Sequence, residues 1–241
     1  MKTRSAVLIF LLIFMISCLP VKKTGSEEEF NRHLYAGLRY IQQKDYFMAK
    51  EELKLALNLN PNSVRANNLM GLAYFREKNY DYAEMYFQKA VKVDPKFAAG
   101  YLNIGAVYAM KELYPKAREY YERALAIAPD LIAAYYSLGA VYFQLGDQQT
   151  GISYLLKGLE LDPDFLEKHS DSITGLPMKG SALPELNFAF AKLYASRGDI
   201  ERTVDYLVRA KQCGFKDWKR IETEPEFASI KEDPRLKEFL K

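Results

Sequence analysis

The sequence is poor in the residues that most catalytic and metal sites require. Its 241 residues include two histidines, His33 and His169, and two cysteines, Cys18 and Cys213. Two cysteines cannot build a disulfide framework, and a structural zinc site usually needs four ligands. The chain also lacks a glycine-rich phosphate loop, a Gly-x-Ser-x-Gly elbow and a His-Glu-x-x-His pair. These absences argue against an enzyme, a bound cofactor, a metal and a small-molecule substrate.

An excess of charge of one sign is also missing. Lys and Arg number 34 and Asp and Glu number 31, for a formal net charge of +3. Nucleic-acid binding depends on clustered basic residues, so this balance argues against a nucleic-acid partner. The chain is 49% apolar and 27% charged, which is typical of a folded globular protein and argues against disorder along most of its length.

Only one long apolar run is present, over residues 6–16. It has eleven residues, whereas a membrane-spanning helix needs about twenty. Lys2 and Arg4 precede the run and the small residue Ser17 follows it, which is the pattern of a secretory signal peptide. We therefore predict a leader over residues 1–17 and a protein exported from the cytoplasm.

The end of the leader resembles a bacterial lipobox. Met15-Ile16-Ser17-Cys18 has the required Cys after a small residue, although Met15 stands where Leu is usual. The resemblance implies a lipid attached at Cys18 and a protein anchored to a bacterial membrane on its periplasmic or outer-membrane side. Two alternatives remain open, namely ordinary cleavage with Cys18 lost or idle, and an uncleaved anchor reaching Leu19. Residues 18–29 are polar after Pro20 and lack periodicity, so we expect a short flexible tether.

Five sets of residues recur every 34 positions along the rest of the chain. They are Pro61, Pro95, Pro129 and Pro163; Gly37, Gly71, Gly105 and Gly139; Tyr40, Tyr74, Tyr108 and Tyr142; Ala49, Ala83 and Ala117; and Ala56, Ala90 and Ala124. Such a fixed period is the signature of a repeat protein.

These columns resemble the tetratricopeptide repeat, which has Gly at position 8, Tyr at 11, Ala at 20 and 27, and Pro at 32. Numbering from Phe30 gives four repeats, over 30–63, 64–97, 98–131 and 132–165, and a fifth, degenerate copy covers 184–217. The resemblance implies an all-α solenoid, a right-handed superhelix of antiparallel helix hairpins. One hairpin cannot bury its own apolar face, so the hairpins must stack.

Two further segments fall outside the repeats. Residues 166–183 break the period and are predicted to form an insert loop, which either lengthens one turn or contacts a partner. Residues 218–241 carry apolar residues spaced to cover the open end of the stack, and Pro225 and Pro234 stand where helices could begin. We expect them to form capping helices.

The family resemblance places the binding surface on the first helix of each repeat, at positions 2, 5, 9, 12 and 13. Carried over by phase, it predicts a groove for a peptide or helix, formed by Arg65, Asn68, Phe75, Arg76, Leu102, Met110, Tyr136, Phe143 and Gln144, with Asn103 beside them. Phe75, Met110, Tyr136 and Phe143 are expected to be exposed, whereas Leu72, Leu102 and the groove alanines fit packing between helices equally well. Leu34, Leu38, Ala99 and Ala133 stand where a chaperone-tail clamp would need polar groups, so no such clamp is expected.

The resulting hypothesis is a membrane-anchored scaffold or adaptor of the bacterial cell envelope. It would bind a partner protein in the groove, much as similar repeat lipoproteins serve envelope assemblies. The alternative is a structural protein of the envelope that associates with its own copies. The sequence names neither the partner nor the membrane.

Overall fold

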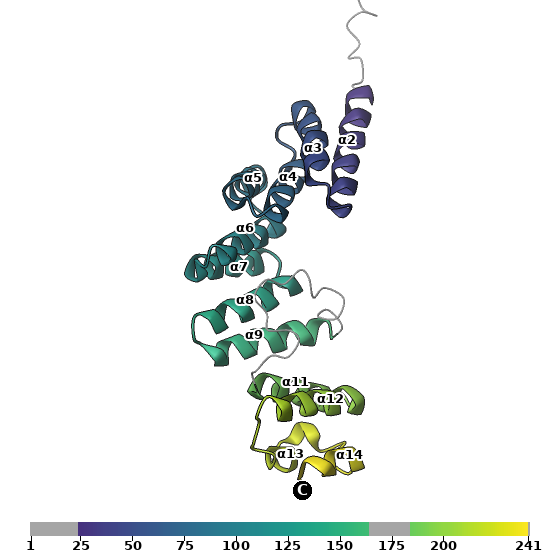
Figure 1. Ribbon diagram of the computed structural model, residues 1–241, viewed down its shortest axis with the longest axis vertical. Helices are drawn as coiled ribbons and strands as arrows, with labels where there is room; N and C mark the ends of the chain where they lie inside the picture. Colours follow the sequence, from purple (N-terminus) through teal and green to yellow (C-terminus); the bar gives the residue numbers. More distant parts are fainter. Residues whose placement is uncertain (1–23, 164–183, 241) are drawn as a thin grey trace, which may run out of the picture.

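The computed structural model describes residues 24–163 and 184–240, and all regular structure within these ranges is helical. The long helices, shown in Figure 1, are α2 (Thr24–Gln42), α3 (Tyr46–Leu59), α4 (Val64–Arg76), α5 (Tyr80–Val93), α6 (Ala98–Met110), α7 (Tyr114–Ile127), α8 (Ile132–Gln144), α9 (Gln148–Leu161), α11 (Pro184–Ser196) and α12 (Ile200–Gln212). Four short elements follow, namely α13 (Arg220–Thr223), η2 (Pro225–Phe227), α14 (Pro234–Lys237) and η3 (Glu238–Leu240).

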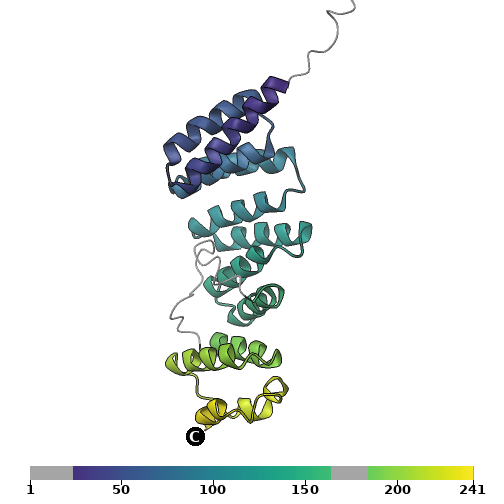
Figure 2. The ribbon, with the colours of Figure 1, turned by 90° about the vertical axis from the view of Figure 1, so that its right-hand side faces the viewer.

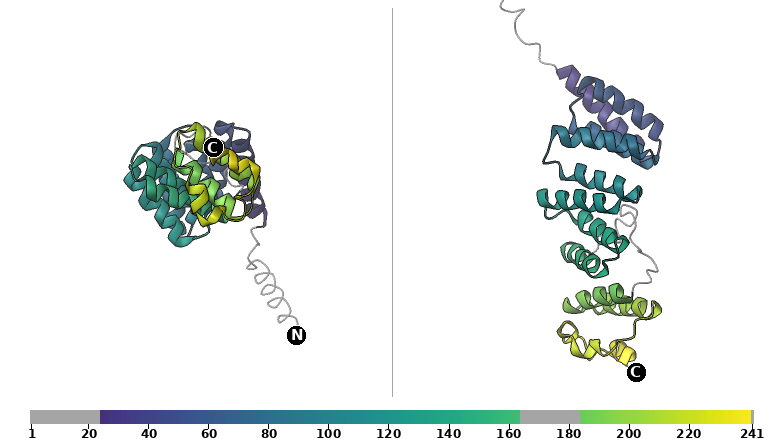
Figure 3. Two further views of the ribbon diagram at one scale, coloured as in Figure 1. Left: turned by 90° about the horizontal axis from the view of Figure 1, so that it is seen from below. Right: turned by 90° about the vertical axis from the view of Figure 1, so that its left-hand side faces the viewer.

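Consecutive helices pair into hairpins, and the hairpins stack into one column (Figures 1 and 2). α2 stands at one end, and the short helices α13 and α14 stand at the other. Seen along the column, successive hairpins are rotated about its long axis (Figure 3, left). The predicted all-α solenoid of helix hairpins is therefore confirmed.

Glycine allows the two helices of a hairpin to approach closely. A Cβ atom on Gly105 of α6 would lie 2.6 Å from ring carbons of Tyr121 on α7, and one on Gly71 would lie 2.6 Å from the ring of Phe87. These distances are shorter than carbon atoms tolerate, so the regular spacing of glycine along the chain has a direct packing cause. In the fifth hairpin Ala191 takes the equivalent position and is fully buried.

Each hairpin turns through a residue in the left-handed conformation. In the first four turns this residue is Lys44 (φ 62°), Lys78 (φ 63°), Glu112 (φ 59°) and Gly146 (φ 85°), and in the fifth it is Gly198 (φ 72°). The next residue precedes the second helix, and three of these residues are aspartates that cap it. Asp45, for example, accepts a hydrogen bond from the backbone N–H of Met48 at 3.1 Å.

The recurrent prolines mark the corners between hairpins. Pro61, Pro95, Pro129 and Pro163 each follow the C-cap residue of a second helix. That residue is driven out of the helical region, as at Asn60 (φ −141°, ψ 87°) and Asp94 (φ −125°, ψ 97°). Proline therefore ends one hairpin and directs the chain into the next.

Stacked tyrosines link the two helices of the later hairpins. The position-11 tyrosine lies over a tyrosine of the second helix in Tyr74–Tyr86, Tyr108–Tyr120, Tyr142–Tyr154 and Tyr194–Tyr206, with ring centroids 5.3–5.6 Å apart. The first hairpin has Glu52 in place of the second tyrosine, and His33 Nδ1 lies 2.6 Å from its carboxylate.

The C-terminal segment closes the last hairpin. Phe227, Ile221 and Leu236 are almost fully buried and share one core with Phe188 of α11 and Leu207 of α12. η2 begins at Pro225 and α14 begins at Pro234, as the sequence suggested.

The N-terminal boundary differs from the prediction. α2 begins at Thr24, so the helix extends into the part of 18–29 that was expected to be a tether. Its first turn holds an acidic residue, Glu27, which the helix dipole favours, and Glu29 pairs with Arg32 at 3.6 Å. The leader, Cys18 and the whole of the insert loop 166–183 lie outside the described residues. Across 24–163 and 184–240, no helix combines the length and apolar character needed to cross a membrane.

Candidate partner-binding surfaces

The first helices of the hairpins form the inner side of the column. Neighbouring first helices, α2 with α4, α4 with α6 and α6 with α8, approach one another more closely than neighbouring second helices do. The column is therefore narrower on the side of the first helices. We call the side formed by α4, α6 and α8 the concave surface, and the side formed by α3, α5, α7 and α9 the outer surface.

The predicted groove residues fall into three groups, which are exposed, half-buried and fully buried. Arg65, Arg76, Met110 and Gln144 are exposed on the concave surface, and Asn68, Phe75, Leu102, Asn103 and Phe143 are half-buried there. The aromatic side chains among them also pack within the stack, since the Phe75 ring lies 5.6 Å from that of Tyr80 and Phe143 contacts the core between α8 and α11. The third group is Tyr136 alone.

Two predicted groove residues are joined by a hydrogen bond. Asn103 Nδ2 on α6 donates a hydrogen bond of 2.8 Å to Asn68 Oδ1 on α4. The pair joins neighbouring first helices across the concave surface. An amide donor and an amide acceptor of the predicted groove are therefore used within the protein. Arg65 is partly held as well, because its guanidinium lies 5.1 Å from the centroid of the Tyr35 ring.

Tyr136 was expected to be exposed in the groove, and this prediction is wrong. Its side chain is completely buried and packs with Leu155, Phe190 and Tyr194. The cause is Gly158 on α9, whose missing Cβ leaves room for the ring; a Cβ there would lie 3.0 Å from Tyr136. Burial also raises the pKa of the Tyr136 hydroxyl. The sequence held a signal for this, because the first three repeats have Ala rather than Gly at position 27.

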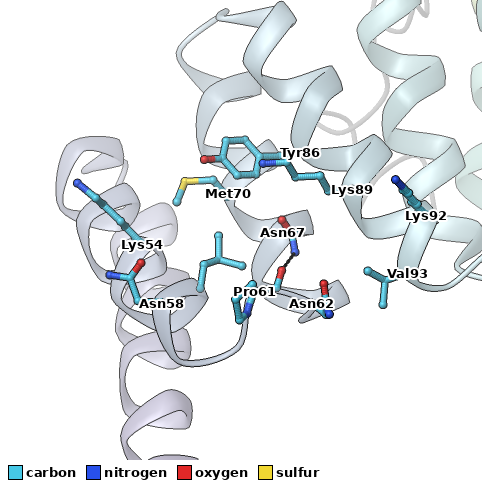
Figure 4. Close-up of a pocket in the computed structure, with 11 residues that line it drawn as sticks. Lys54, Asn58, Pro61, Asn62, Asn67, Met70, Tyr86, Lys89, Lys92 and Val93 are labelled. Atoms are coloured by element: carbon cyan, nitrogen blue, oxygen red, sulfur yellow. Dashed lines mark hydrogen bonds between the residues drawn. The ribbon is translucent and has the colours of Figure 1, made fainter.

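The outer surface carries a cavity that the sequence did not indicate. It lies between α3 and α5 and has a volume of about 670 Å³ (Figure 4). Its described lining consists of Lys54, Leu57, Asn58, Pro61, Asn62, Asn67, Met70, Tyr86, Lys89, Lys92 and Val93. The lining therefore combines three lysines with amide and apolar groups, and its described residues include no carboxylate.

The charged groups elsewhere form structural pairs rather than a reactive cluster. Lys111 lies 2.8 Å from Asp81 and 2.9 Å from Glu84, and Tyr108 donates a 2.7 Å hydrogen bond to Glu84. Burial raises the pKa of Glu84, but the hydrogen bonds from Tyr108 and Lys111 outweigh it and leave the pKa below 4.5. Within the described ranges, no three His, Cys, Asp or Glu side chains are grouped as a metal site would require.

The sequence matches one family model, described as the tetratricopeptide repeat, over residues 62–130 and 96–164. The matched residues cover α4 to α9, which show the expected hairpins and proline corners. Residues 62–164 are tetratricopeptide repeats. Arrays of this family generally act as protein–protein interaction scaffolds, and this tetratricopeptide protein has that general role.

Solved structures agree with the fold. A structure titled as the functional characterisation of PilF from Pseudomonas aeruginosa is 19% identical, with a TM-score of 0.58, and the match covers 90% of this chain and 99% of that one. A thermophilic tetratricopeptide protein of Thermus thermophilus is 19% identical, with a TM-score of 0.53 and coverage of 83% and 97%. YrrB, described as having an unusual peptide-binding site, is 16% identical, with a TM-score of 0.50 and coverage of 80% and 90%. No curated protein matches the sequence.

Proposed function

We propose that this tetratricopeptide-repeat protein is a lipid-anchored adaptor of a bacterial cell envelope, which holds a partner peptide or helix on its concave surface. The observation that supports it most is a strip of apolar side chains near the ends of three neighbouring first helices. Phe75, Met110 and Phe143 occupy it, and Met110 is 39% exposed. Apolar anchors spaced along a groove suit an amphipathic segment.

Polar groups flank this strip and would fix the orientation of the partner. Arg76 and Gln144 are exposed beside the apolar side chains, and Arg65 stands at the N-terminal end of α4. An apolar centre with a charged rim is the usual organisation of a protein interface. The adaptor has no catalytic step of its own. YrrB, with its peptide-binding site, supports a peptide as the partner.

The proposed anchor rests on the leader. Lys2, Arg4, the apolar run and Ser17-Cys18 favour export and acylation at Cys18. Labelling of cells with a radioactive fatty acid tests this directly. We expect label in the natural protein and none in Cys18→Ala, and equal labelling of both would reject the lipid anchor.

Site-specific photocrosslinking in cells tests the concave surface. A benzophenone amino acid at Met110 is compared with one at Val208, which is equally exposed at 39% on α12, the second helix of the fifth hairpin, and serves as the matched control. We expect a discrete crosslinked partner from position 110 and not from position 208, and a weaker band when Arg76→Glu is added.

Two results contradict the proposal. Equal crosslinking from both positions would show that the concave surface has no special role. A crosslink from position 110 to a second copy of the chain would instead support the self-associating structural protein.

A further inference from the structure

The cavity between α3 and α5 exists because of one small residue. The third and fourth repeats have tyrosine at position 4, at Tyr101 and Tyr135. Tyr101 fills the gap between α5 and α7, which corresponds to the gap between α3 and α5, and it is 3% exposed. The Arg123 guanidinium lies 4.3 Å from the centroid of its ring. The second repeat has Asn67 at this position. Because Asn67 is shorter, the space that a tyrosine ring would fill stays open.

Asn67 is itself a buried and oriented polar group. Its side chain is 2% exposed, and its amide nitrogen donates to the carbonyl oxygens of Pro61 at 3.0 Å and Ser63 at 2.9 Å. These two bonds fix the direction of the amide. Its oxygen points away from Pro61, towards the part of the cavity where Tyr86 lies (Figure 4). The floor of the cavity therefore presents a hydrogen-bond acceptor.

Lysines stand on both sides of the opening. Lys54 comes from α3, and Lys89 and Lys92 come from α5 (Figure 4). None of the three forms an ion pair with a residue that the structure describes. Lys89 Nζ lies 4.7 Å from the ring centroid of Tyr86, which holds its charge beside the cavity. The opening is thus positively charged without neutralisation by the described part of the chain.

The walls between these polar groups are apolar. Leu57, Met70 and Val93 contribute to the lining, and Met70 is almost fully buried. A volume of about 670 Å³ lies within the range of sites that hold small ligands or short peptide segments.

We infer that this cavity binds an acidic peptide segment of a partner protein, on the outer surface and independently of the concave surface. Carboxylates of the segment would pair with Lys54 on one side and with Lys89 and Lys92 on the other. A backbone N–H of the segment would donate to Asn67 Oδ1, and an aliphatic side chain would cover Met70. A lipid phosphate satisfies the lysines but offers only acceptor oxygens to the asparagine. The protein would therefore hold two partners at once, one on each surface.

Binding is measured with the full chain in a non-ionic detergent, by fluorescence anisotropy of a labelled octapeptide of alternating glutamate and leucine. The same peptide with glutamine in place of glutamate is the ligand control. Asn67→Tyr should close the cavity while keeping the fold, because Tyr135 in the fourth repeat donates a 2.9 Å hydrogen bond to Pro129 just as Asn67 donates to Pro61. We expect Asn67→Tyr to abolish specific binding without lowering the melting temperature.

A charge variant provides an independent test. The double substitution Lys89→Gln and Lys92→Gln should weaken binding of the glutamate peptide by about tenfold, as expected for two exposed charge pairs. Lys216→Gln and Lys219→Gln remove the same charge from an exposed segment far along the chain and should change binding less than about twofold. Equal weakening by both pairs would show that only net charge matters and would overturn the inference.

Three further results would also overturn it. Unchanged binding by a folded Asn67→Tyr variant would place the peptide outside the cavity. Equal affinity for the glutamine peptide would remove the role of the carboxylates. Displacement of the glutamate peptide by millimolar glycerol phosphate, but not by sodium chloride of equal ionic strength, would identify the site as one for lipid headgroups. None of these results depends on Met110 or Arg76, so they are distinguishable from failure of the concave-surface proposal.

Discussion

At the scale of single residues, each of the first four hairpins depends on the absence of one methyl group. Gly105 faces the ring of Tyr121, and Gly37 and Gly139 face Leu53 and Leu155 in the same way. A large side chain on the second helix, at repeat position 24, fills the space that the glycine leaves. It is Leu53, Phe87, Tyr121 or Leu155. The pair therefore works as one unit, in which small and large residues lie on opposite helices.

Gly105→Ala should destabilise the protein although it improves helix propensity. Alanine gains about 1 kcal/mol over glycine inside a helix, but a Cβ placed 2.6 Å from Tyr121 forces the ring or the helix to move. Overpacking typically costs about 1–3 kcal/mol, so we expect a net loss, measured by urea unfolding.

Ala191 provides the matched control at the same repeat position. The fifth hairpin already accommodates a Cβ there, and the residue is fully buried beside Leu207. Ala191→Gly should also lower stability, by about 1 kcal/mol, because it removes contacts and helix propensity. A rise in stability for Gly105→Ala would contradict the packing argument.

Glu84 makes part of the stability dependent on pH. Despite partial burial, its hydrogen bonds from Tyr108 and Lys111 hold its folded-state pKa below 4.5. A lowered pKa stabilises the folded state above the unfolded value, and this contribution is lost as pH falls through the folded value. Glu84→Gln should therefore lower the free energy of unfolding by about 1–3 kcal/mol at pH 7. The gap between variant and natural protein should narrow as pH falls below 4.5 in urea titrations, and a gap that does not change with pH would contradict it.

At the scale of elements, the turns within the hairpins differ in how well they cap the second helix and in whether glycine takes the left-handed conformation. Asp147 and Asp199 cap α9 and α12 through hydrogen bonds of 3.1 Å and 3.0 Å, and each follows a glycine in the left-handed conformation. In the third hairpin the equivalent residues are Glu112, which takes a positive φ at a cost, and Leu113, which cannot cap α7. This turn is therefore the least favourable locally.

Leu113→Asp should stabilise the third hairpin. The new carboxylate would accept a hydrogen bond from the backbone N–H of Lys116, as Asp45 does from Met48 in the first hairpin. An added cap contributes about 0.5–2 kcal/mol, and the lost leucine is 44% exposed, so little burial is sacrificed. Thermal unfolding at pH 7 checks the gain. Leu113→Ala, which shortens the side chain without adding an acceptor, should show no gain, and an equal gain in both would reject the capping explanation.

The hairpins were predictable from the sequence because their determinants are local. The 34-residue period, the prolines and the small residues act within one hairpin or between neighbours, so phase alone located them. The burial of Tyr136 was only partly signalled in this way. The sequence shows Gly158 in place of the usual alanine, but the packing of α11 against Tyr136 lies beyond a break in the period. The outer cavity was not predicted from the sequence either. The sequence shows only that Asn67 stands where the third and fourth repeats have tyrosine. The structure shows that this smaller side chain leaves a cavity open between α3 and α5.

At the scale of the whole molecule, stability is distributed along the column rather than centred in one core. The apolar clusters follow one another from α2 to the C-terminal cap, and each involves only neighbouring hairpins. In such an array each end can unfold without the other. The cap is held by its own contacts, which include Arg220 paired with Glu185 of α11 at 2.9 Å and Lys192 of α11 paired with Glu224 at 2.9 Å.

Phe227→Ala should therefore loosen one end of the molecule only. The Phe227 ring is fully buried 5.6 Å from that of Phe188, so its removal should cost about 3–5 kcal/mol locally. Hydrogen exchange measured peptide by peptide should show lost protection in α11 to α14 and unchanged protection in α2 to α5. Leu53→Ala, at a fully buried site in the first hairpin, should give the reverse pattern. Uniform loss of protection along the column in either variant would contradict this prediction. It would mean that the hairpins unfold as a single unit, because only tight coupling between all interfaces could carry the loss of stability from one end to the other.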